Sequence, residues 1–384
     1  MSRQIKARLN IGCSVAFLFV VVYLFLHLEE QWEIAGLLIS VPAVLFIFAR
    51  NDGFTNLRQA NLEQPRYGKF LFLLGAIALI FSLRNDHFAL LMLATVLLYS
   101  TVSLGLTIQL GFAGLVNFAG IAFFGIGAYS MAVLNAHMPA VPDLIIILLG
   151  GVFSSIIGAL LILPILRTRG HYAALITIAF CVLFRTFLEV NDVLGGPQGL
   201  KVVGLDIFGW SFDFNFPSAF GGGSFYVAYV VAAALLLLIT FVITKLIESS
   251  WWGLNMDTVR LDEVASASFG IDAPKWKILA FMIGNFFAGL AGAVYGAMSG
   301  FIAPASFNFS DSLLLVSIVL LGGIGNAVSV LPAAFLVVVL PEKFQFIQEY
   351  RLLLFAIVVI LILRFRPSGL MPRRLRHYTA KKTS

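Results

Sequence analysis

The chain is short of charged residues. Only 11% of its 384 residues are Asp, Glu, Lys or Arg, whereas 60% are hydrophobic. A soluble domain carries about 25% charged residues, so a single globular core in water is excluded. The apolar runs are helix-length and lack the polar–apolar alternation of an outer-membrane strand. The sequence therefore predicts an all-α, polytopic membrane protein.

Residues that would carry chemistry are also scarce. The two cysteines, Cys13 and Cys181, lie inside apolar runs, so neither a disulfide framework nor a metal cluster is indicated. No GxxxxGK[ST] phosphate loop occurs, and the turn-rich Gly195–Leu200 lacks the lysine and hydroxyl of one. We also find no plausible catalytic triad. The chain is therefore expected to be no enzyme and to bind no cofactor or metal itself.

The net charge of +6 raises the question of nucleic-acid binding. The basic residues, however, sit in short clusters at the ends of apolar runs, which is how orientation across a bilayer is specified. We expect membrane lipid, and no nucleic acid, to be the partner of this charge.

The apolar runs predict ten to twelve membrane segments. A crossing helix needs about 20 residues, and several runs are shorter. The runs near 312–340 are expected to be half-helices broken at Gly322–Gly325, a break tolerated only where the backbone is buried or lines a cavity. The candidate spans are 11–28, 34–49, 70–84, 88–110, 117–134, 143–166, 171–190, 225–247, 278–299, 312–324, 327–340 and 352–364.

The positive-inside rule orients these spans. The basic clusters expected in the cytoplasm are Arg3/Lys6/Arg8, Arg50/Arg58/Arg66/Lys69, Arg167–Arg169 and the tail with Arg364, Arg366, Arg373, Arg374, Arg376, Lys381 and Lys382. Glu29–Glu33, Asp86 and Asn191–Ser224 are expected outside. The first run is too long for a signal-peptide core and is taken as a retained span. Both termini are then cytoplasmic.

A charged insert, residues 249–277, interrupts the apolar sequence between two spans and should face the cytoplasm. Asn255 is a plausible N-cap, and Asp257 then lies in the first turn of a short amphipathic helix. Gly270 supplies a left-handed stop. Arg260 can pair with Glu263 one turn on. The face of this helix is formed by Leu261, Val264, Ala265, Ser268 and Phe269, with Asp262 elsewhere on its surface.

Two uses of this insert were weighed. A soluble partner protein can grip such a compact helix between two spans. A helix lying on lipid headgroups is the alternative, but the net acidity of residues 257–263 opposes binding to an anionic leaflet. Docking of a cytosolic partner is the favoured interpretation.

Small residues recur from Gly105 to Tyr129, in GLTIQLGFAGLVNFAGIAFFGIGAY. They permit close helix packing or form the wall of a pathway, and both interpretations stay open. The Asn117 amide must find a partner inside the membrane. Arg185 and Glu189 lie four residues apart on one helix face, so Arg185 either pairs with Glu189 and snorkels outward or contacts a zwitterionic solute.

Several motifs together resemble the permease subunits of bacterial branched-chain amino acid ABC importers, of the LivM type. The resemblance covers about residues 105–372. Besides the Gly105–Tyr129 segment, it includes RTRGHYAALITIAF, LGGPQGL, RLDEVASASFGIDAPKWKILAF, AGLAGAVYGAMSGFIAPASF, VLLGGIGNAV and YRLLLFAIVVILILRFRPSGLMP.

The resemblance implies a permease of the inner membrane that pairs with a second, homologous permease, two cytosolic ATPases and an external substrate-binding protein. ATP and Mg would be bound by the ATPases. It also implies that the segment around Arg260, Asp262, Glu263 and Gly270 is a coupling helix. The residues predicted to form the pathway are Asn117, Gly120, Tyr172, Thr177, Arg185, Gly196, Gly322, Gly323 and Gly325.

The sequence is interpreted as one permease domain over 1–384, with less diagnostic spans at 1–87, a core at 88–372 and a basic tail at 373–384. The expected cargo is a branched-chain or related amino acid. Urea or short amides stay open, because related permeases serve them. An ion-driven secondary transporter is the alternative of another class, and it would need midplane ionisable residues that the interior spans almost lack.

Overall fold

The structure is a computed structural model. It describes residues 3–28, 30, 32–34, 36–37, 40–41, 44, 64–167, 172–207, 210–212, 223–343, 350, 353, 356–357, 360, 364, 369–371 and 373. The expected spans 34–49 and 352–364 lie largely outside these residues, as do Arg50, Arg58, Arg169 and most of the basic tail.

The described chain is helical apart from short loops and four two-residue strands, so the all-α prediction is confirmed. Eight helical segments of the described part are long and apolar enough to cross a membrane. They are Ala7–His27, His87–Phe112, Gly120–His137, Asp143–Leu166, Tyr172–Val190, Tyr226–Ser249, Ala273–Ser299 and Pro304–Gly322. The predicted spans 88–110, 143–166, 171–190 and 225–247 match these segments closely.

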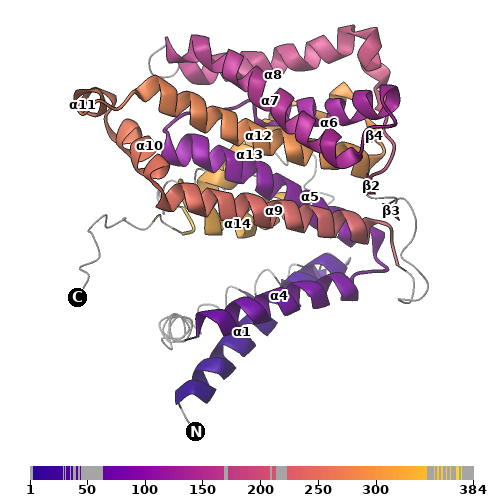
Figure 1. Ribbon diagram of the computed structural model, residues 1–384. Coiled ribbons are helices and arrows are strands. Elements are labelled where there is room, and N and C mark those ends of the chain that lie inside the picture. The colour runs from indigo at the N-terminus through magenta and orange to yellow at the C-terminus, as the bar shows by residue number, and fades with distance from the viewer. Residues whose placement is uncertain are drawn as a thin grey trace. The chain divides into compact units, whose positions relative to one another are not determined.

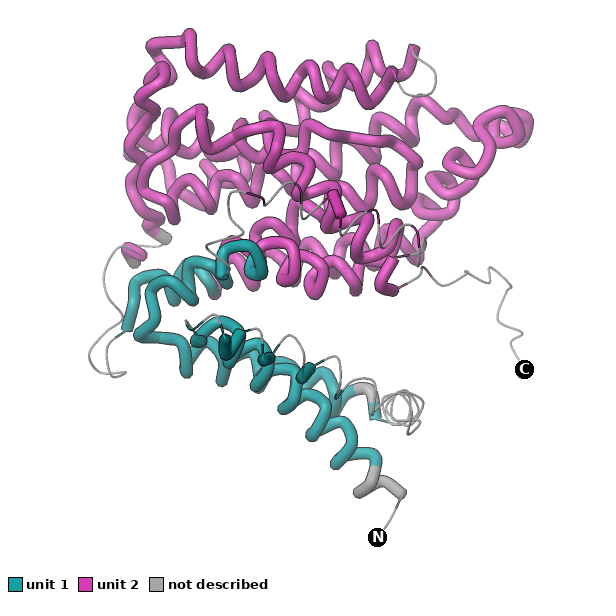
Figure 2. The backbone as a smooth tube through the Cα atoms, turned by 180° about the vertical axis from the view of Figure 1, so that it is seen from behind, with its two compact units in different colours: residues 1–93, 215–230, 339–348 teal, residues 94–214, 231–338, 349–384 magenta. Residues whose placement is uncertain are grey.

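The chain divides into two compact units, coloured separately in Figure 2. The first contains residues 1–93, 215–230 and 339–348, and the second contains residues 94–214, 231–338 and 349–384. Three helices have residues in both units: α5 (His87–Leu106), α9 (Tyr226–Ser249) and α14 (Val330–Lys343).

In the first unit, α1 (Arg3–His27) packs on α4 (Pro65–Ser82). A Cβ on Gly75 would overlap the Phe19 ring, so the glycine lets the two helices approach. The buried Lys343 donates from Nζ to the carbonyls of Leu26 (2.7 Å) and Leu28 (2.9 Å). A cation there satisfies carbonyls that have no helical partner at the end of α1.

The core of the second unit is built from α6 (Gly120–His137), α7 (Asp143–Leu166) and α12 (Ala273–Ser299), which lie side by side in Figure 1. Backbones meet directly where glycines face each other. A Cβ on Gly127 would overlap the Gly289 carbonyl, and one on Gly289 would overlap that of Gly150. Small residues are how membrane helices pack closely, so the packing interpretation of the glycine-rich segment is confirmed for Gly127.

Two breaks interrupt the membrane helices of this unit. After α5, a π-helical turn, η1 (Thr107–Phe112), leads into non-helical residues 113–119 before α6. The helix α13 (Phe309–Gly322) ends at Gly323 with φ +117°, and a 3-10 turn, η6 (Ala327–Ser329), leads into α14. The predicted break at Gly322–Gly325 is therefore confirmed. Both breaks lie together, because a Cβ on Gly111 would overlap the Gly325 backbone.

The remaining elements form two polar ends. At one end are α10 (Trp251–Leu261) and α11 (Glu263–Ser268), and at the opposite end the strands, as Figure 1 shows. The strand end contains η2 (Asp192–Leu194), η3 (Gly196–Gln198), η5 (Pro304–Ser306), and the pairs β1 (Leu200–Lys201) with β4 (Phe301–Ile302) and β2 (Asp206–Ile207) with β3 (Trp210–Ser211). The helix α8 (Tyr172–Val190) leads into this end.

Candidate functional site: a charged insert and a buried polar cluster

The charged insert begins with α10. Ser250 is its N-cap, and the Ser250 side chain accepts a hydrogen bond from the Trp252 N–H. The prediction that Asn255 caps the helix is wrong, because Asn255 is buried within α10. Serine and asparagine are both favoured at N-cap positions. Of these two residues, however, only Ser250 has the extended backbone that an N-cap requires.

The insert then breaks at Asp262. This residue is extended (φ −158°, ψ 112°), and its side chain accepts from the N–H groups of Val264 and Ala265, so it caps α11. The predicted single helix with one face through Leu261, Val264, Ala265, Ser268 and Phe269 is therefore wrong: Leu261 belongs to α10, and only Val264, Ala265 and Ser268 lie within α11. The stop at Gly270 is confirmed by its φ of +76°.

The ion pairs of the insert also differ from the prediction. Arg260 lies with Nε 3.6 Å from Asp257 Oδ1 on its own helix, and does not pair with Glu263. Glu263 instead pairs with Lys277, in the first turns of α12. The reason is the break at Asp262, which ends the helical register that would place Arg260 and Glu263 one turn apart.

The two halves of the insert differ in exposure. In α10, Met256 and Val259 are buried. Around α11, three large apolar side chains stand out: Leu261 is 75% exposed, Val264 79% and Phe269 85%. Such a group of exposed apolar residues beside acidic ones is the composition of a surface that a partner covers. We call Leu261, Val264 and Phe269 the apolar tip.

Among the predicted pathway residues, Asn117 is the centre of a buried amide cluster. Its Nδ2 donates to Gln109 Oε1 (2.9 Å) and to Asn285 Oδ1 (3.2 Å). Gln109 Nε2 in turn donates to Asn285 Oδ1 (2.9 Å) and to the Phe281 carbonyl (3.1 Å). The cluster joins η1, the non-helical segment 113–119 and α12. It gives the Asn117 amide the partner that the sequence demanded.

The non-helical segment is held by hydroxyls as well. The Phe118 N–H donates to Thr177 Oγ1 at 3.1 Å, and Ser312 Oγ donates to the Phe118 carbonyl. Gly120 begins α6, and a Cβ there would press on Leu106 and Leu315. The structure thus brings Asn117, Thr177 and Gly120 together around one break in the helices.

Arg185 lies near the strand end of α8. Its Nε donates to Glu189 Oε1 at 2.8 Å, which confirms the expected i, i+4 pair, and its Nη1 donates to Asn308 Oδ1. Gly196 follows in η3, which packs on α8. Tyr172 begins α8 and is exposed, so it lies apart from both groups.

The last three pathway residues, Gly322, Gly323 and Gly325, lie at the break after α13. The predicted residues therefore divide into a central group, a group at the strand end and a group at the glycine break. Sequence reasoning missed Gln109 and Asn285, although an amide inside an apolar run is itself a signal of an intramembrane polar contact.

The sequence can now be compared with known proteins. Residues 88–363 match the family described as "Branched-chain amino acid transport system / permease component". This match covers more than half of the chain. The chain belongs to this family.

Individual relatives agree. The chain is 34% identical over 265 residues to the high-affinity branched-chain amino acid transport system permease protein LivM of Salmonella typhimurium and 32% identical over 268 residues to that of Escherichia coli. In both cases 65% of this chain matches 62% of the relative. A probable LivM protein of Methanocaldococcus jannaschii is 26% identical over 289 residues, covering 66% of this chain and 78% of the relative. No solved structure matches.

The family match includes the insert, the amide cluster and the glycine break, but not every residue at the site. The helices α1 and α4 precede residue 88, and the segment from Gly369 to Arg373 follows residue 363. The matched relatives are named as permease proteins of transport systems.

Proposed function

We propose that the chain is the permease subunit of an ATP-driven ABC importer for branched-chain or related amino acids. The apolar tip is the observation that carries the proposal. Leu261, Val264 and Phe269 are large, apolar and exposed on a charged insert between two spans, which fits the groove of a soluble partner better than it fits water.

In this proposal two cytosolic ATPases bind the insert, and a second, homologous permease supplies the other half of the pathway. ATP and Mg belong to the ATPases. ATP binding there moves α10 and α11, and the movement alters the helices that flank the amide cluster and the glycine break. An external binding protein delivers the solute to the strand end, and the chain lies in the inner membrane with both termini in the cytoplasm.

The solute pathway would run past Asn117, Gly120, Thr177, Arg185 and Gly196 toward Gly322, Gly323 and Gly325. These residues mark the strand end of the second unit and the two breaks in its helices. A backbone break offers carbonyl and N–H groups to a polar solute inside the membrane, which unbroken helices do not.

The test uses the reconstituted complex. Vesicles loaded with ATP should accumulate radiolabelled leucine when the binding protein is present, and vesicles with an ion gradient but no ATP should not. Val264→Asp places a charge on the apolar tip and should abolish both ATPase co-purification and uptake. Val193→Asp is the matched control, since Val193 is 77% exposed at the strand end and should leave the ATPases bound. Uptake driven by the gradient alone would overturn the proposal.

A further inference from the structure

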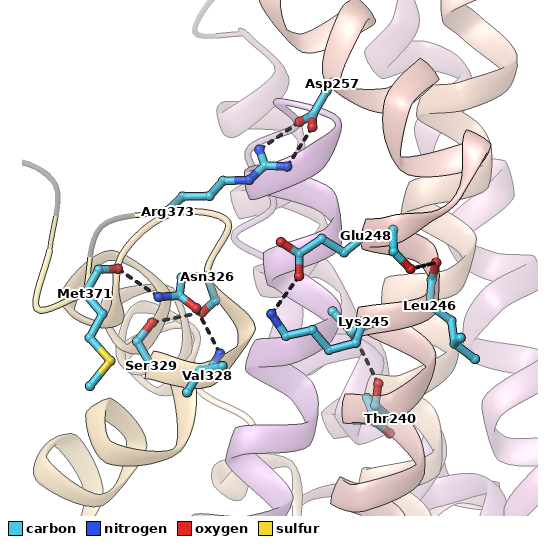
Figure 3. A network of polar contacts seen from close by, with 12 residues as sticks. Thr240, Lys245, Leu246, Glu248, Asp257, Asn326, Val328, Ser329, Met371 and Arg373 are labelled. Carbon is cyan, nitrogen blue, oxygen red and sulfur yellow. Dashed lines mark hydrogen bonds and ion pairs between the residues drawn. The ribbon is translucent and has the colours of Figure 1, made fainter. Parts of the chain in front are cut away.

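The segment Gly369–Arg373 closes the end of the broken helix α13. The Leu370 N–H donates to the Leu321 carbonyl (2.9 Å) and the Met371 N–H to the Gly322 carbonyl (3.1 Å). Asn326 Nδ2 donates to the Met371 carbonyl at 3.1 Å (Figure 3). The segment thus supplies donors to carbonyls that the helix break leaves without helical partners. We call residues 369–371 and 373 the C-terminal strap.

The strap ends in a partly buried ion pair with the insert. Arg373 Nη1 and Nη2 donate to Asp257 Oδ1 and Oδ2, both at 2.7 Å, as Figure 3 shows. The Arg373 side chain is only 15% exposed and that of Asp257 only 13%. Arg373 Nη1 also donates to the Gly111 carbonyl at 3.2 Å, and the guanidinium lies 5.0 Å from the centre of the Phe112 ring.

These contacts place the Arg373 side chain between three segments, α10, η1 and the glycine break, that change position in the proposed transport cycle. Asp257 lies on α10, Gly111 and Phe112 end η1, and the Arg373 Cδ lies against the position that a Cβ on Gly325 would take. Arg260 also approaches Asp257, but it belongs to α10 itself, and its side chain lies against Gly114 of the segment 113–119.

We propose that Arg373 is a positioning residue that transmits movement of the ATPase-docking insert to the glycine break. The inference rests on the function proposed above. A bidentate arginine–carboxylate pair fixes orientation as well as distance, which a lysine cannot do. Because the strap is hydrogen-bonded to the end of α13, a displacement of α10 pulls on Leu321 and Gly322. The Gly111 contact carries the same displacement to η1.

The experiment separates docking from transmission. Arg373→Gln should leave the ATPases co-purifying and hydrolysing ATP, while uptake per ATP falls by at least about tenfold, within the range of typical coupling free energies. Arg373→Lys should fall between this variant and the wild type. Arg8→Gln is the matched control, because Arg8 forms an exposed hydrogen bond with Gln64 outside the insert and the predicted pathway, and it should transport normally.

A double variant guards against simple misfolding. Arg373→Gln alone leaves the partly buried Asp257 carboxylate without this partner, which destabilises the fold. Asp257→Asn with Arg373→Gln removes both charges. We expect this variant to recover yield and thermal stability but to remain uncoupled, since two neutral amides do not clamp the strap to α10.

Three outcomes would overturn the inference: wild-type uptake by Arg373→Gln, full recovery of uptake in the double variant, or loss of ATPase co-purification in Arg373→Gln alone. The last result would make the pair part of the docking surface. A wild-type chain that never binds the ATPases would instead refute the proposed function, so the two failures are distinguishable.

Discussion

The two halves of the charged insert differ in how far their apolar side chains are covered, although α10 also exposes Trp251 and Trp252. In α10, Asp257 lies in a partly buried ion pair, and Met256 and Val259 are covered by the rest of the second unit. Around α11, the apolar tip is exposed, although its residues are as apolar as those of α10. The contrast fits the proposed function, in which buried side chains of α10 hold the insert to the rest of the protein and the ATPases contact the apolar tip around α11.

The largest expected effect tests the anchored half. Met256→Ala removes a fully buried side chain and should lower the free energy of unfolding by about 2–5 kcal/mol. Thermal unfolding of the purified chain in detergent measures this. Val264→Ala is the control and should change stability by no more than about 0.5 kcal/mol. Equal losses in the two variants would remove the distinction between the halves.

The presented half should behave in the opposite way. Phe269→Ala should leave stability unchanged but weaken ATPase binding by more than about 1 kcal/mol, roughly five- to tenfold, as truncation of an interface anchor does. Titration of the reconstituted permease with the ATPases measures the affinity. An unchanged affinity would show that the apolar tip is not covered by this partner.

The junction between the halves depends on a single cap. Asp262→Ala removes the acceptor for two N–H groups of α11 and should cost about 1 kcal/mol of local helix stability. Hydrogen exchange over residues 263–268 should accelerate. Asp262→Ser keeps a capping oxygen and should retain most of the protection. If residues 263–268 exchange at the same rate in the alanine and serine variants, the cap does not hold the junction.

The smallest effect concerns the end of the insert. The hydrogen bond from Lys275 holds the pKa of the exposed Asp272 carboxylate below its usual value. The stabilisation that this hydrogen bond contributes is therefore present above the ordinary carboxyl pKa. It is lost as the pH falls through the lowered pKa of Asp272.

Lys275→Ala removes the largest cause of this lowered pKa, the side-chain hydrogen bond, and leaves the backbone N–H of residue 275 as a donor. Protection of the Lys275 amide position, at the start of α12, should then be lost at a higher pH than in the wild type. Hydrogen-exchange protection factors across an acid titration measure it. Lys277→Ala, which removes a cation paired with Glu263, should not move the midpoint.

Local signals predicted much of this architecture. The left-handed stop at Gly270 and the break at Gly322–Gly325 were predictable because a glycine's effect on its own backbone depends little on distant residues. The Arg185–Glu189 pair followed from helix periodicity. The charged residues between two apolar runs located the insert, and the resemblance to permeases agreed with that placement.

Contacts between distant segments could not be predicted in the same way. Arg373 was expected in a cytoplasmic tail because it belongs to a basic cluster. Its pairing with Asp257 could not be predicted, because the two residues are 116 apart and nothing in either local sequence records the contact. Asn255 was misassigned as a cap because its preference for caps is local, whereas its burial is set by the tertiary fold. The sequence showed that the Asn117 amide needs a hydrogen-bond partner inside the membrane. It did not show that Gln109 and Asn285 are these partners.

Labelling of the apolar tip tests the central claim most directly. In a Cys13→Ser background, Phe269→Cys should react with a membrane-impermeant maleimide only in inside-out vesicles, and bound ATPases should block the reaction. Reaction in right-side-out vesicles, or equal reaction with and without the ATPases, would contradict the claim that α11 is their docking site.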